Sequence, residues 1–143
     1  MFRIQEVHIE GKDDPKWNMP YTPALKIEGG SLIFAAGVTA APVYHSHPHR
    51  PEEFTDIPED AGLQASMALD NLDGVLSAAG ATLEDIVQLF RFIVDIARNQ
   101  DAINAVLAKR ITRRVTSTTV EVTRLATDPK LLLELTTVAA VPG

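Results

Sequence analysis

Residues 68–96 read ALDNLDGVLSAAGATLEDIVQLFRFIVDI, and this stretch joins a helix to a strand. Apolar residues recur at helical spacing and predict a helix over residues 60–79. Its inner stripe consists of Ala68, Leu72, Val75, Leu76 and Ala79. Gly80 ends the helix, because glycine tolerates the left-handed conformation that commonly follows a last helical turn.

The segment after Gly80 is predicted to be a strand. TLED at 82–85 resembles a capping box, but IVQLFRFIVDI at 86–96 is rich in β-branched and aromatic residues. Its even positions are apolar apart from Gln88, whereas its odd positions mix Arg91 and Asp95 with apolar residues. A strand that is apolar on both sides is expected to be covered on both sides.

The rest of the chain supplies further strands, one more helix and two long loops. Periodicity and turn residues predict a strand over 2–9, a loop over 11–23, a β-hairpin over 24–37 turning at Gly29-Gly30, a loop over 43–60, a helix over 100–110, and strands over 117–125 and 131–141. This order predicts one α+β domain over residues 1–143, with a single sheet and two helices on one face. Subunit association is expected to cover the other face.

The composition is that of a globular protein. Of 143 residues, 45% are hydrophobic and 22% are charged. A net charge of −6 argues against a nucleic-acid partner, and the basic cluster KRITRR at 109–114 is short. The chain has no cysteine, no visible signal peptide and no apolar run long enough to span a bilayer. We therefore expect a cytoplasmic protein without a membrane partner.

Three stretches resemble the RidA/YjgF family of reactive-intermediate deaminases. They are MPYTPALKIEGGSLIFAAG at 19–37, the block at 68–96, and TTVEVTRLATDPKLLLEL at 118–135. The resemblance implies a chorismate-mutase-like α+β fold, assembled as a homotrimer with clefts between subunits. It also implies hydrolysis of enamines and imines to ammonia and a keto acid, with no metal or other cofactor. In the family an arginine binds the substrate carboxylate through two hydrogen bonds, and a glutamate near the C-terminus positions the water.

Four site residues of the family have counterparts in this chain. They are Tyr21, Phe92, Asn104 and the water-positioning Glu134. The arginine has no counterpart, because Ser117 stands at its position in VTSTTVEV. The serine and glutamine of the family's SGQ become Ala36 and Val38. Loss of a charge-assisted contact worth roughly 1.5–3 kcal/mol predicts that ordinary keto-acid imines bind poorly.

Two arginines precede Ser117. Arg114 is a candidate replacement for the missing group, although an odd offset along a strand points it to the opposite face. Arg113 shares the parity of Ser117 but lies further out, and it is ranked below Arg114. A solvated basic pair is the alternative for both. Main-chain N–H groups near Ser117 and Thr118 are expected to bind a substrate oxygen.

Glu134 and Tyr21 each have a functional and a structural interpretation. If the strand LLLEL is buried, desolvation raises the pKa of the Glu134 carboxyl and suits it to general-base work. Alternatively, the acid points outward between apolar neighbours. Tyr21 either contacts the substrate or packs in its loop with a partly hydrated hydroxyl.

HSHPH at 45–49 places three histidines two residues apart. His45 and His47 are candidates for acid–base chemistry near neutral pH in a loop beside the subunit cleft. The spacing of His45, His47 and His49 also suits a transition metal, but Pro48 interrupts any regular strand. A polar surface loop is the third interpretation, and no metal is expected.

The residues and the resemblance together predict a small-molecule enzyme. It would catalyse hydrolysis, deamination or a related proton transfer at a C=N or C=C bond of an atypical substrate in the intersubunit cleft. The alternative is a non-catalytic trimer that binds a metabolite or a protein through the same cleft.

Overall fold

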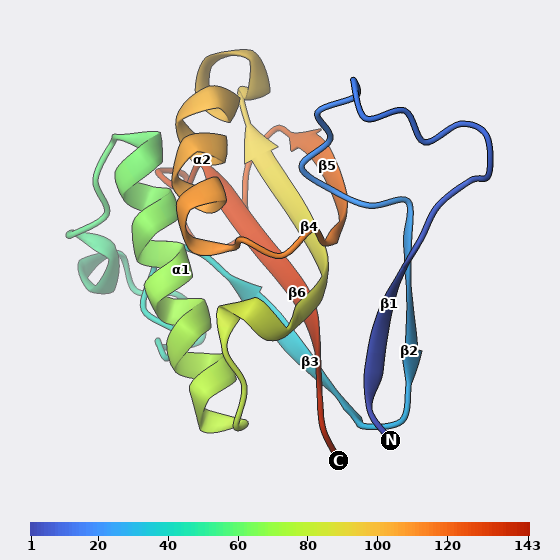
Figure 1. Ribbon diagram of the computed structural model, residues 1–143. Coiled ribbons are helices and arrows are strands. Elements are labelled where there is room, and N and C mark those ends of the chain that lie inside the picture. Colours follow the sequence, from blue (N-terminus) through green and yellow to red (C-terminus); the bar gives the residue numbers. More distant parts are fainter.

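The computed structural model describes residues 1–143 and consists of six strands and two α-helices (Figure 1). In chain order the elements are β1 (Arg3–Val7), β2 (Ala24–Glu28), β3 (Ser31–Val38), a 3-10 helix (Pro51–Phe54), α1 (Ala61–Ala78), a 3-10 helix (Leu83–Asp85), β4 (Ile86–Val94), α2 (Ile96–Arg110), β5 (Thr116–Val122) and β6 (Leu133–Val141). Neither helix is long and apolar enough to cross a membrane.

The α+β class is confirmed, with both helices on one face of a four-stranded sheet ordered β3-β6-β4-β5 (Figure 1). β6 runs antiparallel to β3 and β4, whereas β5 runs parallel to β4. The core lies between this face and the helices, where Leu72, Leu76, Ile93, Ile103 and Leu135 are fully buried. Helix α1 packs through most of the predicted stripe, with Ala68, Leu72 and Leu76 buried and Val75 partly buried, but the predicted Ala79 is exposed and follows the last helical residue.

The strands form two sheets, which corrects the predictions of a single sheet and of a β-hairpin over 24–37. The β2 strand pairs with β1 in a separate two-stranded sheet, and β3 pairs with β6, so β2 and β3 do not form a hairpin. Gly29 and Gly30 do have positive φ angles, of 71° and 78°. The turn is therefore as predicted, but a turn does not determine which strands pair beyond it, and here the two strands diverge (Figure 1).

The junction after α1 follows the predicted signals. Gly80 has a φ of 80°, and Thr82 and Asp85 form the capping box of the short 3-10 helix that leads into β4. The strand ends at Val94 and not at Ile96, because Asp95 adopts a left-handed conformation with a φ of 48°. Helix α2 consequently begins at Ile96, four residues before the predicted residue 100.

Helix α1 begins with a side-chain cap. The Asp60 carboxylate accepts a hydrogen bond of 2.8 Å from the main-chain N–H of Leu63. Replacing such a cap by alanine costs typically about 1 kcal/mol, since one N–H of the first turn loses its partner. We expect Asp60→Ala to lower the free energy of unfolding by about that amount. Urea denaturation measures it, and Asp60→Asn, which also caps helices, should retain most of the stability.

The second face of the sheet carries apolar residues that are exposed or only partly buried in a single chain. Strand registers place Leu32 and Phe34 of β3 on this face with Phe90 and Phe92 of β4 and Val120 of β5. Leu32 is 52% exposed and Phe34 is 76% exposed. We refer to this surface, defined by those five residues, as the open face.

Candidate active site

A cavity of about 180 Å³ lies where α2, β4 and the start of β5 meet the loop before β2. Its lining includes Tyr21, Arg91, Asn104, Arg113 and Ser117, among apolar neighbours such as Leu89, Leu107 and Val115. Three of the sequence-predicted site residues, Tyr21, Asn104 and Ser117, are therefore brought together. The cavity is small enough to select a ligand of few atoms.

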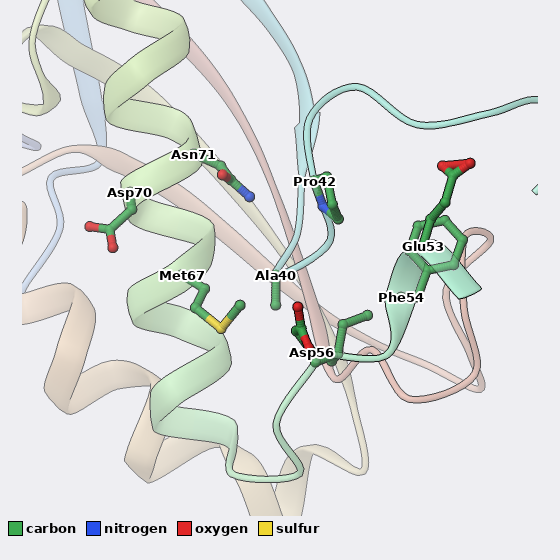
Figure 2. Close-up of a pocket in the computed structure, with 9 residues that line it drawn as sticks. Ala40, Pro42, Glu53, Phe54, Asp56, Met67, Asp70 and Asn71 are labelled. Carbon is green, nitrogen blue, oxygen red and sulfur yellow. The ribbon is translucent and has the colours of Figure 1, made fainter. Parts of the chain in front are cut away.

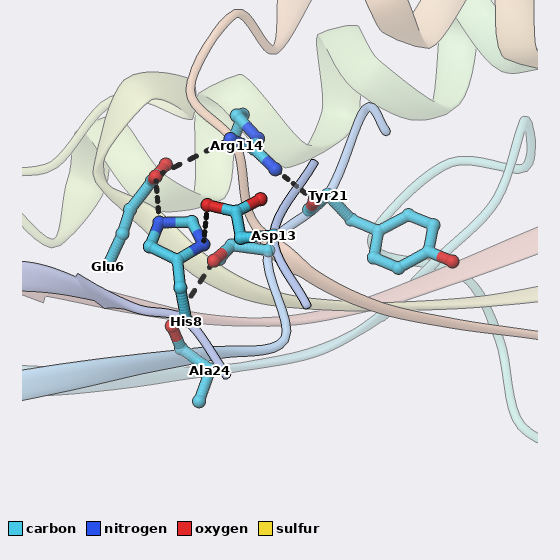
Figure 3. A network of polar contacts seen from close by, with 7 residues as sticks. Glu6, His8, Asp13, Tyr21, Ala24 and Arg114 are labelled. Atoms are coloured by element: carbon cyan, nitrogen blue, oxygen red, sulfur yellow. Dashed lines mark hydrogen bonds and ion pairs between the residues drawn. The ribbon is translucent and has the colours of Figure 1, made fainter. Parts of the chain in front are cut away.

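Tyr21 reaches the cavity because its loop attaches to β5. It forms an isolated parallel bridge with Val115, and Thr22 N–H donates a 3.0 Å hydrogen bond to the Val115 carbonyl. The Arg114 guanidinium donates a 3.0 Å hydrogen bond to the Tyr21 carbonyl and lies 3.6 Å from the Glu6 carboxylate. Figure 3 shows the Tyr21 ring pointing away from this polar network.

Arg91 is the cationic group of the cavity that the sequence interpretation missed. Leu89 is opposite Ser117 in the parallel ladder, and side chains alternate along a strand, so Arg91 lies on the same face as Ser117. Its guanidinium donates to the Asn104 side-chain oxygen. Burial lowers the pKa of Arg91 from its ordinary value, which marks this cation as partly desolvated.

Two polar atoms in this cavity have no partner within the chain. They are Nε of Arg91 and Oγ of Ser117, and both are buried. Buried donors without partners cost free energy, and in native proteins they commonly await water or a ligand. A ligand with acceptor oxygens beside these two residues would give each atom a partner. The donors suit a carboxylate or a carbonyl oxygen.

The structure corrects the ranking of the two arginines in TRRV. Arg113 lines the cavity and donates a 2.8 Å hydrogen bond to the Glu84 carbonyl. Arg114 points to the other side, where it binds the Tyr21 carbonyl and Glu6. The side chains therefore alternate between the two faces from Arg114 to Ser117, as expected for a strand. Arg114 supports the position of Tyr21 but does not line the cavity.

The other predicted site residues lie on the opposite face of the sheet. Glu134 is opposite Phe92 in the β4–β6 ladder, and Thr118 is opposite Phe90 in the β4–β5 ladder. Because Ser117 and Thr118 are neighbours in a strand, their side chains point to opposite faces. A single chain thus does not bring Glu134, Phe92 or Thr118 to the cavity that contains Ser117.

Glu134 lines a second cavity, of about 130 Å³, with Gly37, Val75 and His45. Burial raises the pKa of the Glu134 carboxyl, as expected for a general base in an apolar strand. Gly37 makes room for it, since a Cβ at residue 37 would lie only 2.1 Å from the carboxylate oxygen Oε2. His45, a predicted acid–base residue, is therefore near Glu134, whereas His47 does not line this cavity.

A third cavity, of about 370 Å³, lies between α1 and the 3-10 helix at Pro51–Phe54 (Figure 2). Its polar lining is acidic, with Glu53, Asp56 and Asp70. No residue that the sequence analysis selected belongs to it. It provides no cation for an acidic substrate, and we assign it no catalytic role.

The fold and the first cavity define an α+β protein with a compact cavity beside α2. Residues 11–141 match the model of a protein family described as Endoribonuclease L-PSP. A RutC family protein of Saccharolobus solfataricus is 29% identical over 126 residues, which cover 87% of this chain and 90% of that protein. These matches show that the chain belongs to the RidA/YjgF family, as the sequence motifs predict.

Solved structures show the same fold. The Rid-family protein YyfB of Yersinia pestis superposes with a TM-score of 0.75 at 24% identity, covering 96% of this chain and 98% of that one. A Mycobacterium tuberculosis member of the YjgF/YER057c/UK114 family gives 0.62 at 28% identity, covering 97% and 100%. TdcF of E. coli, solved with bound serine, gives 0.62 at 26% identity, covering 86% and 89%.

Proposed function

We propose that the protein hydrolyses the C=N bond of a small imino acid bound at Arg91, including the imine that forms when the tautomeric enamine is protonated at carbon. The observation that carries this proposal is the cavity in which Arg91 Nε and Ser117 Oγ are buried without partners beside Asn104. The bound serine of the related TdcF supports a small ligand with a carboxylate. Tyr21 would contact the substrate, and Glu134 would activate the water.

The substrate class differs from the one that Ser117 alone suggests. The sequence favours a neutral or differently charged ligand because the arginine of β5 is missing. Arg91 places a guanidinium in the same cavity from β4, so an acidic ligand again finds a charged donor. Because the cation enters from a different strand, the bound acid would lie in a different orientation. We therefore propose an imine or enamine of a small acid, bound in an orientation that differs from the one in the family.

Assembly into a homotrimer would complete this site. Within one chain Arg91 and Glu134 lie on opposite faces of the sheet, so the water-activating carboxylate would come from a neighbouring subunit. The open face supplies an apolar surface for that contact, with Phe34 76% exposed. Apolar patches of this kind commonly mark interfaces.

Phe34→Asp tests the assembly. A carboxylate at the centre of an apolar contact would lose hydration without gaining a partner, so we expect the variant to dissociate into monomers and to lose hydrolysis. Sedimentation velocity measures the mass of the assembly. Tyr44 is 94% exposed and does not belong to the open face. Tyr44→Asp is therefore the matched control and should remain assembled. A monomeric wild-type protein would contradict the proposal.

Ammonia release tests the activity. Freshly generated 2-iminopropionate is added to the wild-type protein, and release is compared with that in buffer and with heat-inactivated protein. We expect an acceleration that saturates with substrate. No acceleration with this imine or with larger imino acids would contradict the proposed hydrolysis.

The alternative is a binding protein without catalysis. It is favoured by the separation of Arg91 from Glu134, because a cavity without the carboxylate could bind an acid but not activate water. The family description also raises ribonuclease activity. The net charge of −6 and a cavity of about 180 Å³ do not suit a polyanionic chain. The predicted cytoplasmic location stays a prediction.

A further inference from the structure

We propose that His45, His47 and His49 form a binding site for a divalent transition metal, with Zn²⁺ as the ion that fits best. The three histidines belong to the loop between β3 and α1. Their candidate ligand nitrogens all lie within 4.8 Å of one another. The ring centroids form a nearly equilateral triangle with sides of 4.9, 5.1 and 5.2 Å. The proposal does not depend on the proposed hydrolysis.

The separation of the nitrogens suits a site that closes around an ion. Two imidazole nitrogens bound to one tetrahedral Zn²⁺ at about 2.0–2.1 Å lie about 3.4 Å apart. The nitrogens of this chain would therefore approach one another by about 1.4 Å at most. His47 and His49 are exposed, so rotation of their side chains can supply this movement.

His45 is held in the tautomer that a metal requires. Its Nδ1 lies 2.8 Å from the Pro42 carbonyl oxygen, which can only accept a hydrogen bond. Nδ1 therefore carries the proton, and Nε2 of the neutral ring has a free lone pair. Metal-binding histidines almost always donate their second nitrogen in this way, which fixes the ring and raises its basicity.

The loop is ordered around the three rings. Phe54, 1% exposed, makes edge contacts with His45 and His49 at centroid distances of 5.3 and 5.9 Å. The Glu53 carboxylate accepts a 2.9 Å hydrogen bond from the N–H of Ser46, between two of the histidines. Figure 2 shows Glu53, Phe54 and Asn71 around the start of this loop.

Asn71 ties the loop to the rigid core. Its amide on α1 donates hydrogen bonds of 2.8 Å to the carbonyls of Thr39 and Ala41, just before the histidines. An aromatic contact, a fixed tautomer and two anchors distinguish the cluster from histidines scattered on a surface. Such supporting contacts are what keep the ligands of a metal site in place.

The ligand set indicates the metal and the type of site. Imidazole nitrogens suit Zn²⁺, Cu²⁺, Ni²⁺ and Fe²⁺ but not Mg²⁺ or Ca²⁺, which prefer oxygen. Three protein ligands leave one coordination position for water or a ligand atom, as in zinc sites that take part in chemistry. His45 also lines the cavity around Glu134, so an ion bound here would lie at the rim of that cavity.

Calorimetric titration with ZnCl₂ tests the site. The protein is used as the full chain, without an affinity tag, after treatment with EDTA and dialysis. We expect one Zn²⁺ per chain. Each of His45→Ala, His47→Ala and His49→Ala should weaken binding at least about tenfold, since even outer contacts of metal sites change affinity by 10–100-fold. The remaining histidine provides the matched control: His8→Ala should bind like the wild type.

Two further measurements make the outcome decisive. His49→Gln keeps a side chain of similar size without the imidazole, and it should weaken binding as His49→Ala does. Circular dichroism checks that each variant is folded. Co²⁺ in place of Zn²⁺ should give the visible absorption of a four-coordinate ion, and this absorption should disappear in the His47→Ala protein. No saturable binding, or binding that His8→Ala weakens as much as His49→Ala does, would overturn the proposal.

Discussion

Arg91→Met should reduce kcat/KM for imine hydrolysis by about tenfold to a hundredfold, because a hydrogen bond to a charged group is worth about 1.5–3 kcal/mol. Methionine has similar length and no donor, so a substrate carboxylate in this cavity would lose the Arg91 guanidinium and keep donors such as Ser117 and Arg113. Nε of Arg91 is buried without a partner in the free protein. The variant also loses the hydrogen bond from Arg91 to Asn104, so circular dichroism and urea denaturation check that it remains folded.

The controls separate charge from geometry. Arg91→Lys keeps the charge but loses the planar pair of donors, and it should fall between the wild type and Arg91→Met. Arg98→Gln removes an exposed arginine of the neighbouring helix and should leave kcat/KM unchanged. Steady-state ammonia release measures all four proteins. Equal kcat/KM for the wild type and Arg91→Met would show that the acid is bound elsewhere.

Glu134→Gln should lower kcat by about 10²–10⁴-fold, the usual contribution of a general base. Glutamine preserves the shape of the side chain beside Gly37 but cannot accept a proton from water. Stopped-flow detection of imine disappearance measures the chemical step. Loss of less than tenfold would exclude Glu134 as the group that activates water.

The same substitution should change the pH dependence of stability. Burial raises the pKa of Glu134 above its usual 4.5, so the folded chain binds the proton more tightly than the unfolded chain does. The contribution of Glu134 to the free energy of unfolding therefore decreases as the pH rises through 4.5 to the raised pKa. Glu134→Gln lacks this loss and should be the more stable protein at pH 7. Near pH 4 the two proteins should be similarly stable, which urea denaturation at both pH values can establish.

Local signals in the sequence were sufficient for most elements. The stripe in α1, the stop at Gly80 and the capping box at 82–85 depend on neighbouring residues. All three are present in the structure, except that Ala79 of the predicted stripe is exposed. The pairing of β2 with β1 depends on contacts between distant segments, which the Gly29-Gly30 turn does not encode. The early start of α2 at Ile96 follows from the left-handed Asp95, a conformation that the sequence pattern does not indicate.

The candidate site was predictable in part. The alternation of side chains along β5 correctly predicted that Arg114 and Ser117 point in opposite directions. The family motifs selected Tyr21 and Asn104, which line the cavity. Arg91 was visible as a charged residue on the odd positions of β4, between the buried Leu89 and Ile93. That Arg91 lines a cavity could not be predicted, because the cavity forms only when α2 and β5 lie beside β4.

A crystal structure of the protein grown with pyruvate tests the central claim most directly. We predict the carboxylate in the cavity beside α2, within hydrogen-bond distance of the Arg91 guanidinium and of Ser117 Oγ. A carboxylate bound by another cation, at any other place in the protein, would contradict it.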